Sequence, residues 1–424
     1  MNYLTPIIIL LLYTSVCSQK RSCTSNERTQ QLINSDPTYA AFHKKVKAQD
    51  KNGTYYQPFH RAPCTSDNKI ILPIAIHYEN IGHVVSSEIA CLESLALDQV
   101  QILNDDYQGT NADISNWITQ DKPLFPSGTN HGESCIEFCL PTQGHPTSLG
   151  DYTGNYAITI NRFSGDNAPG WNGYINVYIR DIEYLGYSPI PGNGTSDTGV
   201  TIDDNAFGSF SCSGTNLIIQ APYNKGRTLT HELGHNLNLY HIWGGGCSSD
   251  DGVSDTPHQQ SDYGGCPNTP ATCGSLDMHM NYMDYVYDEC MYMFSSGQVI
   301  RMENQVNSNM QNVINNGLVI CATTPPSECP PSYSAANGNP LTGIASQTGG
   351  TYDNGDYETD GAIESTQTIQ TNSIIDYDSN THICLNQGFY APANTEFHAF
   401  IDGCNGGIGG GSIKDDESSD KNLK

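Results

Sequence analysis

Residues 231 to 241 read His231-Glu-Leu-Gly-His-Asn-Leu-Asn-Leu-Tyr-His241, and this stretch decides the fold and the chemistry that we expect. On a helix, His231 and His235 stand four residues apart, so both side chains project from one face. Two imidazoles so placed can share a tetrahedral zinc ion. Glu232 is too near them in sequence to join easily as a ligand, but it can take a proton from a water on the metal.

The third histidine requires a sharp turn in the chain. His241 follows His235 by six residues, and a continuous helix would rotate it well away from the zinc-binding face. The chain must leave the helix between them, and Asn238 stands where that turn is needed. A structural zinc usually has a fourth protein ligand, and the nearest cysteine, Cys247, is more simply explained by a disulfide. The pattern therefore favours a catalytic zinc site with one open position.

The composition excludes some partners. The chain has 424 residues, enough for two or three domains, with 18 Lys and Arg against 45 Asp and Glu and a net charge of −27. This acidity argues against nucleic acid as a partner and favours solubility, calcium binding or basic substrates. A solvated acidic surface is the simplest interpretation.

Residues 1–18 have the pattern of a secretory signal peptide. An apolar run over residues 7–12 precedes Val16-Cys17-Ser18, which predicts cleavage near Gln19. The chain has fifteen cysteines, fourteen once Cys17 is removed, and such a number fits disulfides formed in an oxidising compartment. No other apolar stretch is long enough to span a bilayer. We therefore expect a secreted, extracellular protein without a transmembrane segment.

The remaining chain divides into segments of different pattern. Residues 19–65 are polar and partly helical in pattern, and they are too few for a self-sufficient domain. Residues 66–323 combine β-rich runs at 70–78, 135–140, 156–160, 174–179 and 216–220 with a helical pattern at 86–104, which predicts an α/β domain. A proline-rich linker follows at 324–333, then a small all-β module of solenoid or adhesion type at 334–408, and a disordered tail at 409–424.

The zinc motif resembles that of the metzincin metallopeptidases, His-Glu-x-x-His-x-x-Gly-x-x-His followed by a methionine-bearing turn. Asn238 occupies the glycine position, and Asn is the residue other than glycine that best tolerates the left-handed conformation. The methionine turn corresponds to Asn281-Tyr-Met283-Asp-Tyr285. Segments at 241–247, 253–257 and 281–298 narrow the resemblance to the pappalysin group, including the ulilysin-like bacterial enzymes, over residues 22 to about 320.

This resemblance implies an architecture. We expect a mixed twisted sheet with two long helices, the second carrying the zinc motif, above an irregular lower part that contains the methionine turn. The cleft between the two parts would hold an extended peptide against an edge strand. Met283 would form the floor beneath the zinc, and Tyr285 would reach towards the metal or the tetrahedral intermediate.

The loops between the zinc helix and the methionine turn carry further implied features. The resemblance pairs Cys247 with Cys273 and Cys266 with Cys290. It also places calcium at an oxygen-rich loop, although the same oxygens could form a solvated loop. The loop residues are Asp250, Asp251, Asp255 and Thr256.

The segment beginning Arg21-Ser-Cys23-Thr resembles the propeptide of this group, which implies a propeptide over residues 19–65. In such propeptides a cysteine can occupy the open zinc position and keep the enzyme latent. The usual Cys-Gly is Cys-Thr here, Cys64 is a competing candidate, and either cysteine could instead form an ordinary disulfide.

The sequence thus predicts a secreted zinc metalloendopeptidase, made as a latent proenzyme and acting as a monomer on proteins or peptides. Related enzymes often prefer Arg or Lys beside the cleaved bond. One alternative is an inactive binding or adhesion protein that keeps its zinc site and attaches to surfaces through the C-terminal module, but the intact Glu232 argues against it. The other is a small-molecule zinc hydrolase, which the extended motif disfavours.

Overall fold

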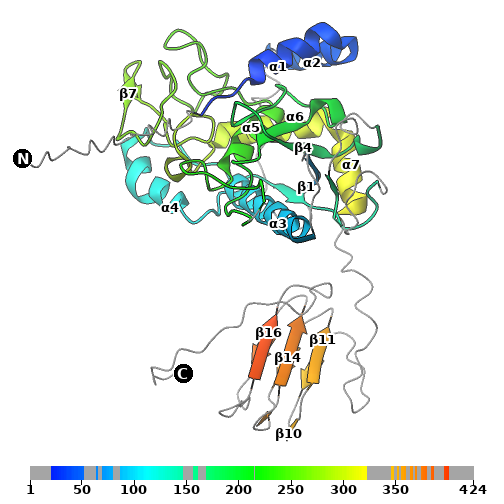
Figure 1. Cartoon of the computed structure of the whole chain (residues 1–424). Helices are drawn as coiled ribbons and strands as arrows, with labels where there is room; N and C mark the ends of the chain where they lie inside the picture. The colour runs from blue at the N-terminus through cyan, green and yellow to red at the C-terminus, as the bar shows by residue number, and fades with distance from the viewer. Residues whose placement is uncertain are drawn as a thin grey trace, which may run out of the picture. The chain divides into compact units, whose positions relative to one another are not determined.

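The computed structural model describes residues 21–51, 64, 69–79, 86–146, 156–160, 170–213 and 215–321, and the backbone of strands between 345 and 400. The predicted signal peptide, linker and tail lie outside these residues. The chain folds as two compact units, Met1–Ala322 and Thr323–Lys424 (Figure 1). Among the described residues, none of the helices combines the length and apolarity that a bilayer crossing requires.

A mixed sheet of six strands forms the centre of the first unit. The strands lie in the order β2-β1-β4-β6-β5, and β3 also pairs with β1. All of these pairings are parallel except that of β5 with β6. The bounds are β1 Ile70–Tyr78, β2 Ile136–Cys139, β3 Ile158–Ile160, β4 Ile175–Arg180, β5 Gly186–Tyr187 and β6 Val200–Asp203. A short hairpin of β7 Ala271–Thr272 and β8 Ser275–Leu276 lies in a later loop.

Four of the five predicted strands are confirmed, with ends shifted by up to two residues. The prediction at 216–220 is wrong, because this segment bonds to turn residues instead of joining a ladder: Leu217 accepts from Cys212, and Gln220 donates to Asn205. The sequence pattern missed β5 and β6. Two and four residues are too few to show an alternation of polar and apolar side chains.

The helices cover the sheet and extend from it (Figure 1). Helix α3 packs on β2 and α5, and α7 packs on β1. The last contact is so close that a Cβ on Gly317 would lie 2.1 Å from the carbonyl oxygen of Ile71. The bounds are α1 Ser25–Ser35, α2 Pro37–Lys51, α3 Ser86–Gln108, α4 Ile114–Asn116, α5 Arg227–Asn236, α6 Ser296–Asn309 and α7 Gln311–Ile320, with single turns at Trp117–Asp121, Lys122–Leu124, Pro169–Trp171, Ser196–Thr198 and Asp288–Cys290.

The two helices predicted to be long differ in length. Helix α3 contains 23 residues, as expected, but the zinc-motif helix α5 contains only 10. The N-terminal segment, which the sequence predicts to be a propeptide, forms the α1–α2 pair, and its residue Cys23 pairs in parallel with Gly186 at the edge of the sheet. The edge strand that we expected to receive a peptide is therefore occupied by the chain's own N-terminal segment.

Five disulfides join the described cysteines: Cys64–Cys135, Cys91–Cys212, Cys139–Cys321, Cys247–Cys273 and Cys266–Cys290. The last two are the pairs that the resemblance implies. Cys64 is not the latency cysteine, because its sulfur is already bonded to Cys135. Cys23 is the free thiol among the described cysteines.

The second unit consists of short strands that pair in parallel. The sheets are β9-β12-β15, β11-β14-β16 and β10-β13. Strands of the first sheet begin at residues 345, 363 and 383, so the chain returns to the same sheet after 18 and then 20 residues. This return is typical of a solenoid. The bounds are β9 Ala345–Gln347, β10 Thr351–Tyr352, β11 Gly355–Thr359, β12 Ile363–Ser365, β13 Thr368–Ile369, β14 Ile374–Ser379, β15 Ile383–Leu385 and β16 Glu396–Phe400.

Candidate metal centre and catalytic site

Helix α5 presents the first two histidines from a fully buried position. The His231 ring nitrogen Nδ1 lies 2.7 Å from the carbonyl oxygen of Tyr282, and Nδ1 of His235 lies 2.8 Å from that of Leu239. Because a carbonyl can only accept, each Nδ1 carries the proton and each Nε2 keeps a lone pair. Burial lowers the pKa of His235 to about 4 and that of His231 below its usual range, so both rings are neutral.

The helix ends in a turn that returns the third histidine to the first two. Asn238 has φ 75°, in the left-handed region. Its N–H donates to His235 and the N–H of Leu239 donates to Gly234, the two bonds of a Schellman motif. This turn brings His241 Nε2 to 3.0 Å from His235 Nε2. The helix ends at Asn236 and the chain turns at Asn238, between His235 and His241 as expected.

The three histidines and Cys23 fit a zinc ion. Their ligand atoms all lie within 4.8 Å of one another. The Nε2 atom of His231 is buried without a hydrogen-bond partner, and the Nε2 atoms of His235 and His241 face each other at 3.0 Å, an arrangement that suits a shared cation. Two nitrogens bound to one tetrahedral zinc would be about 3.3 Å apart. Three neutral imidazoles and one thiol are a donor set that zinc prefers.

Glu232 lies beside the same centre and is covered by the N-terminal segment. Its Oε2 accepts from the Ser25 hydroxyl at 3.0 Å and lies 3.3 Å from the Cys23 sulfur. Ser25 in turn accepts from the backbone N–H of Ser188 at 2.8 Å. Burial raises the pKa of Glu232 to about 7. Sequence reasoning missed Ser25, which stands two residues after the candidate latency cysteine.

Met283 lies directly beneath the zinc helix. It is fully buried, and a Cβ added to Gly234 would lie 2.6 Å from its sulfur. The turn is fixed from below, because the Asn281 side chain accepts from the N–H of Met283 at 2.9 Å and exchanges hydrogen bonds with Gln298. The structure thus places Met283 where the resemblance puts the floor of the site.

Tyr285 stands beside the third histidine. Its ring centroid lies 4.9 Å from that of His241 and 4.8 Å from that of Trp243. Its hydroxyl accepts from the backbone N–H of Cys23 at 3.2 Å. Burial, together with Cys23 and Glu232, raises the pKa of Tyr285, so its hydroxyl remains a hydrogen-bond donor at neutral pH.

Arg21, which sequence reasoning missed, is buried against the catalytic unit. The Arg21 guanidinium forms an ion pair with Asp288 and lies 4.9 Å from the ring centroid of Tyr223, and both charged side chains are buried. The backbone N–H of Lys225 donates a hydrogen bond to the Asp288 carboxylate at 2.8 Å and so fixes its orientation. The spacing of Arg21 and Cys23 could have predicted that Arg21 also points into the site, because alternate residues of an extended segment face the same side.

The four residues predicted to hold calcium differ in their hydrogen-bond partners. Asp255 caps helix α6 by accepting from Ser295 and from the N–H of Gly297. Asp251 accepts from Thr256 at 2.7 Å and keeps one buried oxygen without a partner, whereas Asp250 is exposed. A hydrogen bond thus joins two of the four predicted residues, Asp251 and Thr256. Calcium binding at Asp251 remains a prediction.

An α/β fold with three histidines converging from a short buried helix and its left-handed turn, above a buried methionine, defines a metallopeptidase of the metzincin class. Residues 162–307 match the Peptidase_M43 family, described as pregnancy-associated plasma protein-A. Extracellular metalloprotease 1 of Coccidioides posadasii is 31% identical over 245 residues, which cover 55% of this chain and 78% of that protein. The chain belongs to this pappalysin family of metallopeptidases.

Two further comparisons agree with this assignment. An extracellular metalloprotease of Arthroderma otae is 41% identical over 122 residues, 28% of this chain and 44% of that protein. The solved structure of a promirolysin mutant from Tannerella forsythia is similar, with 29% identity and a TM-score of 0.51, over 70% of this chain and 98% of that one. The resemblance predicted from the motifs is thus confirmed, as is the mixed α/β fold.

Proposed function

We propose that this chain is the latent precursor of a secreted zinc endopeptidase. The observation that carries the proposal is the convergence of His231, His235 and His241 with the Cys23 thiol and the Glu232 carboxylate. When bound, zinc would polarise the carbonyl of the scissile peptide bond and acidify water. The extracellular names of the relatives support secretion.

We assign a separate catalytic role to each residue of the site. Glu232 would take the proton of the attacking water and pass it to the leaving amine, because its carboxylate lies beside the position of the metal ligands. Tyr285 would donate its phenolic hydrogen to the oxygen that gains negative charge. Leu239 and Tyr282 would keep the rings of His235 and His231 oriented through their carbonyls.

Latency would follow from the propeptide segment that fills the cleft. The Cys23 sulfur would occupy the fourth position of the metal. Burial and the nearby Glu232 raise the pKa of the Cys23 thiol, so the thiolate would form only when a cation is present. The Ser25 hydroxyl would at the same time hydrogen-bond to Glu232, the general base, and block its access to water.

The ion pair of Arg21 with Asp288 suggests which substrate side chain the enzyme binds. A propeptide that lies in the cleft occupies the subsites a substrate would use, and here Asp288 binds a guanidinium. We infer that the mature enzyme accepts Arg or Lys beside the cleaved bond, with Asp288 binding the cation.

The test is cleavage of a peptide library by the protein freed of its propeptide. Zinc-loaded enzyme is expected to cut beside Arg or Lys, and Glu232→Ala to lower kcat/KM by about 10⁴-fold while zinc stays bound. A chelator should abolish the activity, and added zinc should restore it. A fully zinc-loaded wild type that cleaved no protein or peptide would favour the inactive binding protein instead.

A further inference from the structure

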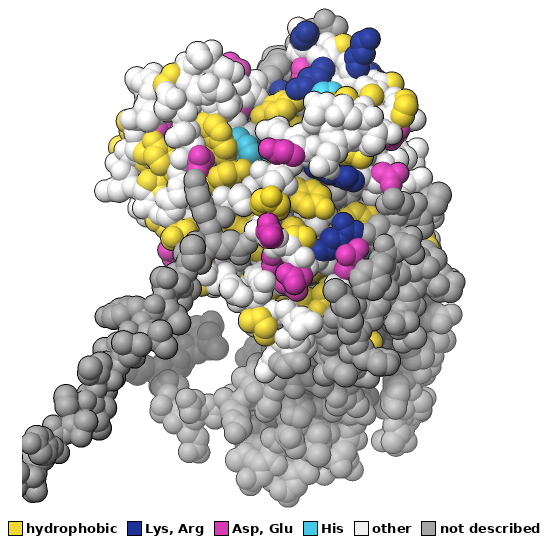
Figure 2. Space-filling model, turned by 45° about the horizontal axis from the view of Figure 1, so that its top comes forward, with side chains coloured by type: hydrophobic (Ala, Val, Ile, Leu, Met, Phe, Trp, Pro, Cys, Tyr) yellow, Lys and Arg dark blue, Asp and Glu magenta, His cyan; other side chains and the backbone are white. Residues whose placement is uncertain are grey.

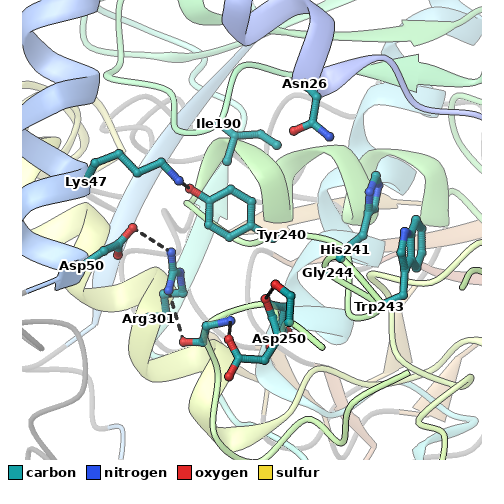
Figure 3. A pocket seen from close by; sticks show the side chains of 14 residues that line it. Asn26, Lys47, Asp50, Ile190, Tyr240, His241, Trp243, Gly244, Asp250 and Arg301 are labelled. Atoms are coloured by element: carbon teal, nitrogen blue, oxygen red, sulfur yellow. Dashed lines mark hydrogen bonds and ion pairs between the residues drawn. The ribbon is translucent and has the colours of Figure 1, made fainter. Parts of the chain in front are cut away.

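A second cavity, of about 390 Å³, begins at the metal ligand His241 and lies under the propeptide helices (Figure 3). Its catalytic-domain wall includes Tyr240, Trp243 and Arg301, and its other wall belongs to the propeptide. The propeptide residues that line it are Asn26, Lys47 and Asp50.

Arg301 is held rigidly at the far end of this cavity. Its Nε donates to the carbonyl of Asn238 at 2.6 Å, and its Nη1 donates to the carbonyl of Gly252 at 3.3 Å. Its guanidinium carbon lies 5.1 Å from the ring centroid of Tyr240. Figure 3 shows the guanidinium at the wall of the cavity, between the Asp50 carboxylate and a backbone carbonyl.

A carboxylate of the propeptide, that of Asp50, binds the Arg301 guanidinium in this cavity. Asp50 accepts from Nη2 of Arg301 at 3.1 Å, and the Arg301 side chain is only 2% exposed. One turn earlier, the Lys47 ammonium lies 4.2 Å from the ring centroid of Tyr240 and covers it. Figure 2 shows several Lys and Arg side chains gathered near the top of the view.

Along the propeptide, the residue that meets Asp288 and the first residue that lines the cavity lie on opposite sides of Cys23. The propeptide passes the metal at Cys23. Arg21, before Cys23, pairs with Asp288, and Asn26, after it, lines the cavity. A peptide that binds a basic residue at Asp288 would therefore place residues from beyond the cleaved bond near Arg301.

We propose that Arg301 is a specificity residue that binds an acidic side chain of the substrate, on the other side of the cleaved bond from the residue held by Asp288. The occupant is argued from Asp50, which puts a carboxylate on the same guanidinium edge in the precursor. A charge-assisted pair between a fixed guanidinium and a carboxylate is stronger and more selective than a neutral contact. This inference rests on the proposed endopeptidase function.

The test uses the mature enzyme and peptides that contain one Arg or Lys beside the cleaved bond. On the other side of that bond, the three nearest positions are varied one at a time, and each is occupied by Glu, Gln or Lys in separate peptides. At one of the three positions, we expect kcat/KM for the Glu peptide to be about tenfold higher than for the Gln peptide, chiefly because KM is lower. Raising NaCl from about 0.05 M to about 1 M should shrink this ratio.

Two variants assign the preference to Arg301. Arg301→Gln should bring the Glu-to-Gln ratio to about one, and Arg301→Lys should keep part of it, because an ammonium still attracts the carboxylate. Arg180→Gln is the matched control, since Arg180 pairs with Glu79 and does not line the cavity, and it should leave the ratio unchanged. Zinc content and the kcat/KM for the Gln peptide check that each variant is intact.

Equal rates for Glu and Gln at all three positions in the wild type would overturn the proposal while leaving the endopeptidase function intact. A preference for Lys would also overturn it and would assign the cavity to Asp250 and Asp251, which lie on its lower wall. Failure to cut any peptide would instead contradict the proposed function. The wild-type ratio decides the matter even if Arg301→Gln does not fold.

Discussion

At the scale of single residues, Asn238 is where this chain departs from the metzincin pattern. The turn requires a left-handed residue, and Asn supplies it at some cost, because both polar atoms of its side chain are buried without hydrogen-bond partners. Arg301 compensates for the irregular turn by binding the Asn238 carbonyl at 2.6 Å. The zinc motif is therefore kept by a tertiary contact and not by the local sequence alone.

We expect Asn238→Gly to stabilise the protein by about 1 kcal/mol, because glycine adopts φ 75° without strain and removes a buried unsatisfied amide. Thermal unfolding of the zinc-loaded precursor measures the effect, with zinc affinity as the control for an unchanged site. A lower unfolding temperature would mean that the packing of the Asn side chain outweighs its unsatisfied polar atoms.

Cys23 should be the residue that keeps the precursor inactive. In the intact precursor, Cys23→Ala is expected to raise peptide cleavage at least tenfold, because the thiolate ligand is lost. Activity should stay below that of the mature enzyme, since Arg21 and Ser25 still occupy the cleft. Cleavage is measured on a short peptide, with intact mass confirming that the propeptide is uncut.

The double variant Cys23→Ala, Glu232→Ala is the control for self-processing and should stay inactive. If Cys23→Ala remained as silent as the wild type while zinc was bound, latency would have to come from the buried Arg21–Asp288 pair and not from the thiol.

At the scale of elements, the contact between helix α5 and the methionine turn positions the site. Gly234 faces the Met283 sulfur from one side, while Asn281 and Gln298 hold the turn from the other. Helix α6 contributes to this support through a capping box formed by Ser295 and Gln298. A shift of the turn would therefore move the histidines of α5.

We expect Gly234→Ala to destabilise the protein by about 2 kcal/mol and to weaken zinc binding, because its Cβ would lie 2.6 Å from the Met283 sulfur. Denaturant unfolding and zinc competition measure the two effects. Gly264→Ala is the matched control, since a Cβ there meets no atom within 4 Å. An unchanged stability would show that Met283 can move aside freely.

At the scale of the whole molecule, the Cys64–Cys135 disulfide constrains maturation. A cut after Cys64 would leave the propeptide covalently attached to the catalytic domain. We therefore expect the activating cut on the N-terminal side of Cys64, so that the mature enzyme keeps Cys64 and begins earlier than the boundary at residue 66 that the sequence suggested.

The N-terminal sequence and the intact mass of the activated enzyme, recorded without reductant, test this expectation. Reduction should release no further peptide from the mature form. A mature chain that began after Cys64 and retained full activity would show that the disulfide does not govern release.

The sequence by itself determined whatever depends on neighbouring residues. The spacing of His231, His235 and His241 required a helix and a turn, and Asn238 could supply that turn. The apolar run of β1 and the periodicity of α3 were also legible, because their patterns repeat over many residues. These local features were sufficient to predict the fold class and that the three histidines would come together.

Tertiary structure alone decided what meets across the chain. Arg21 and Asp288 are 267 positions apart, and Arg301 and Asp50 are 251 apart, so no local pattern relates either pair. Cys64 could have been a latency thiol until folding placed it beside Cys135. Periodicity reports which face of an element is buried, but the partner of a charged or sulfur-bearing side chain depends on how distant elements pack.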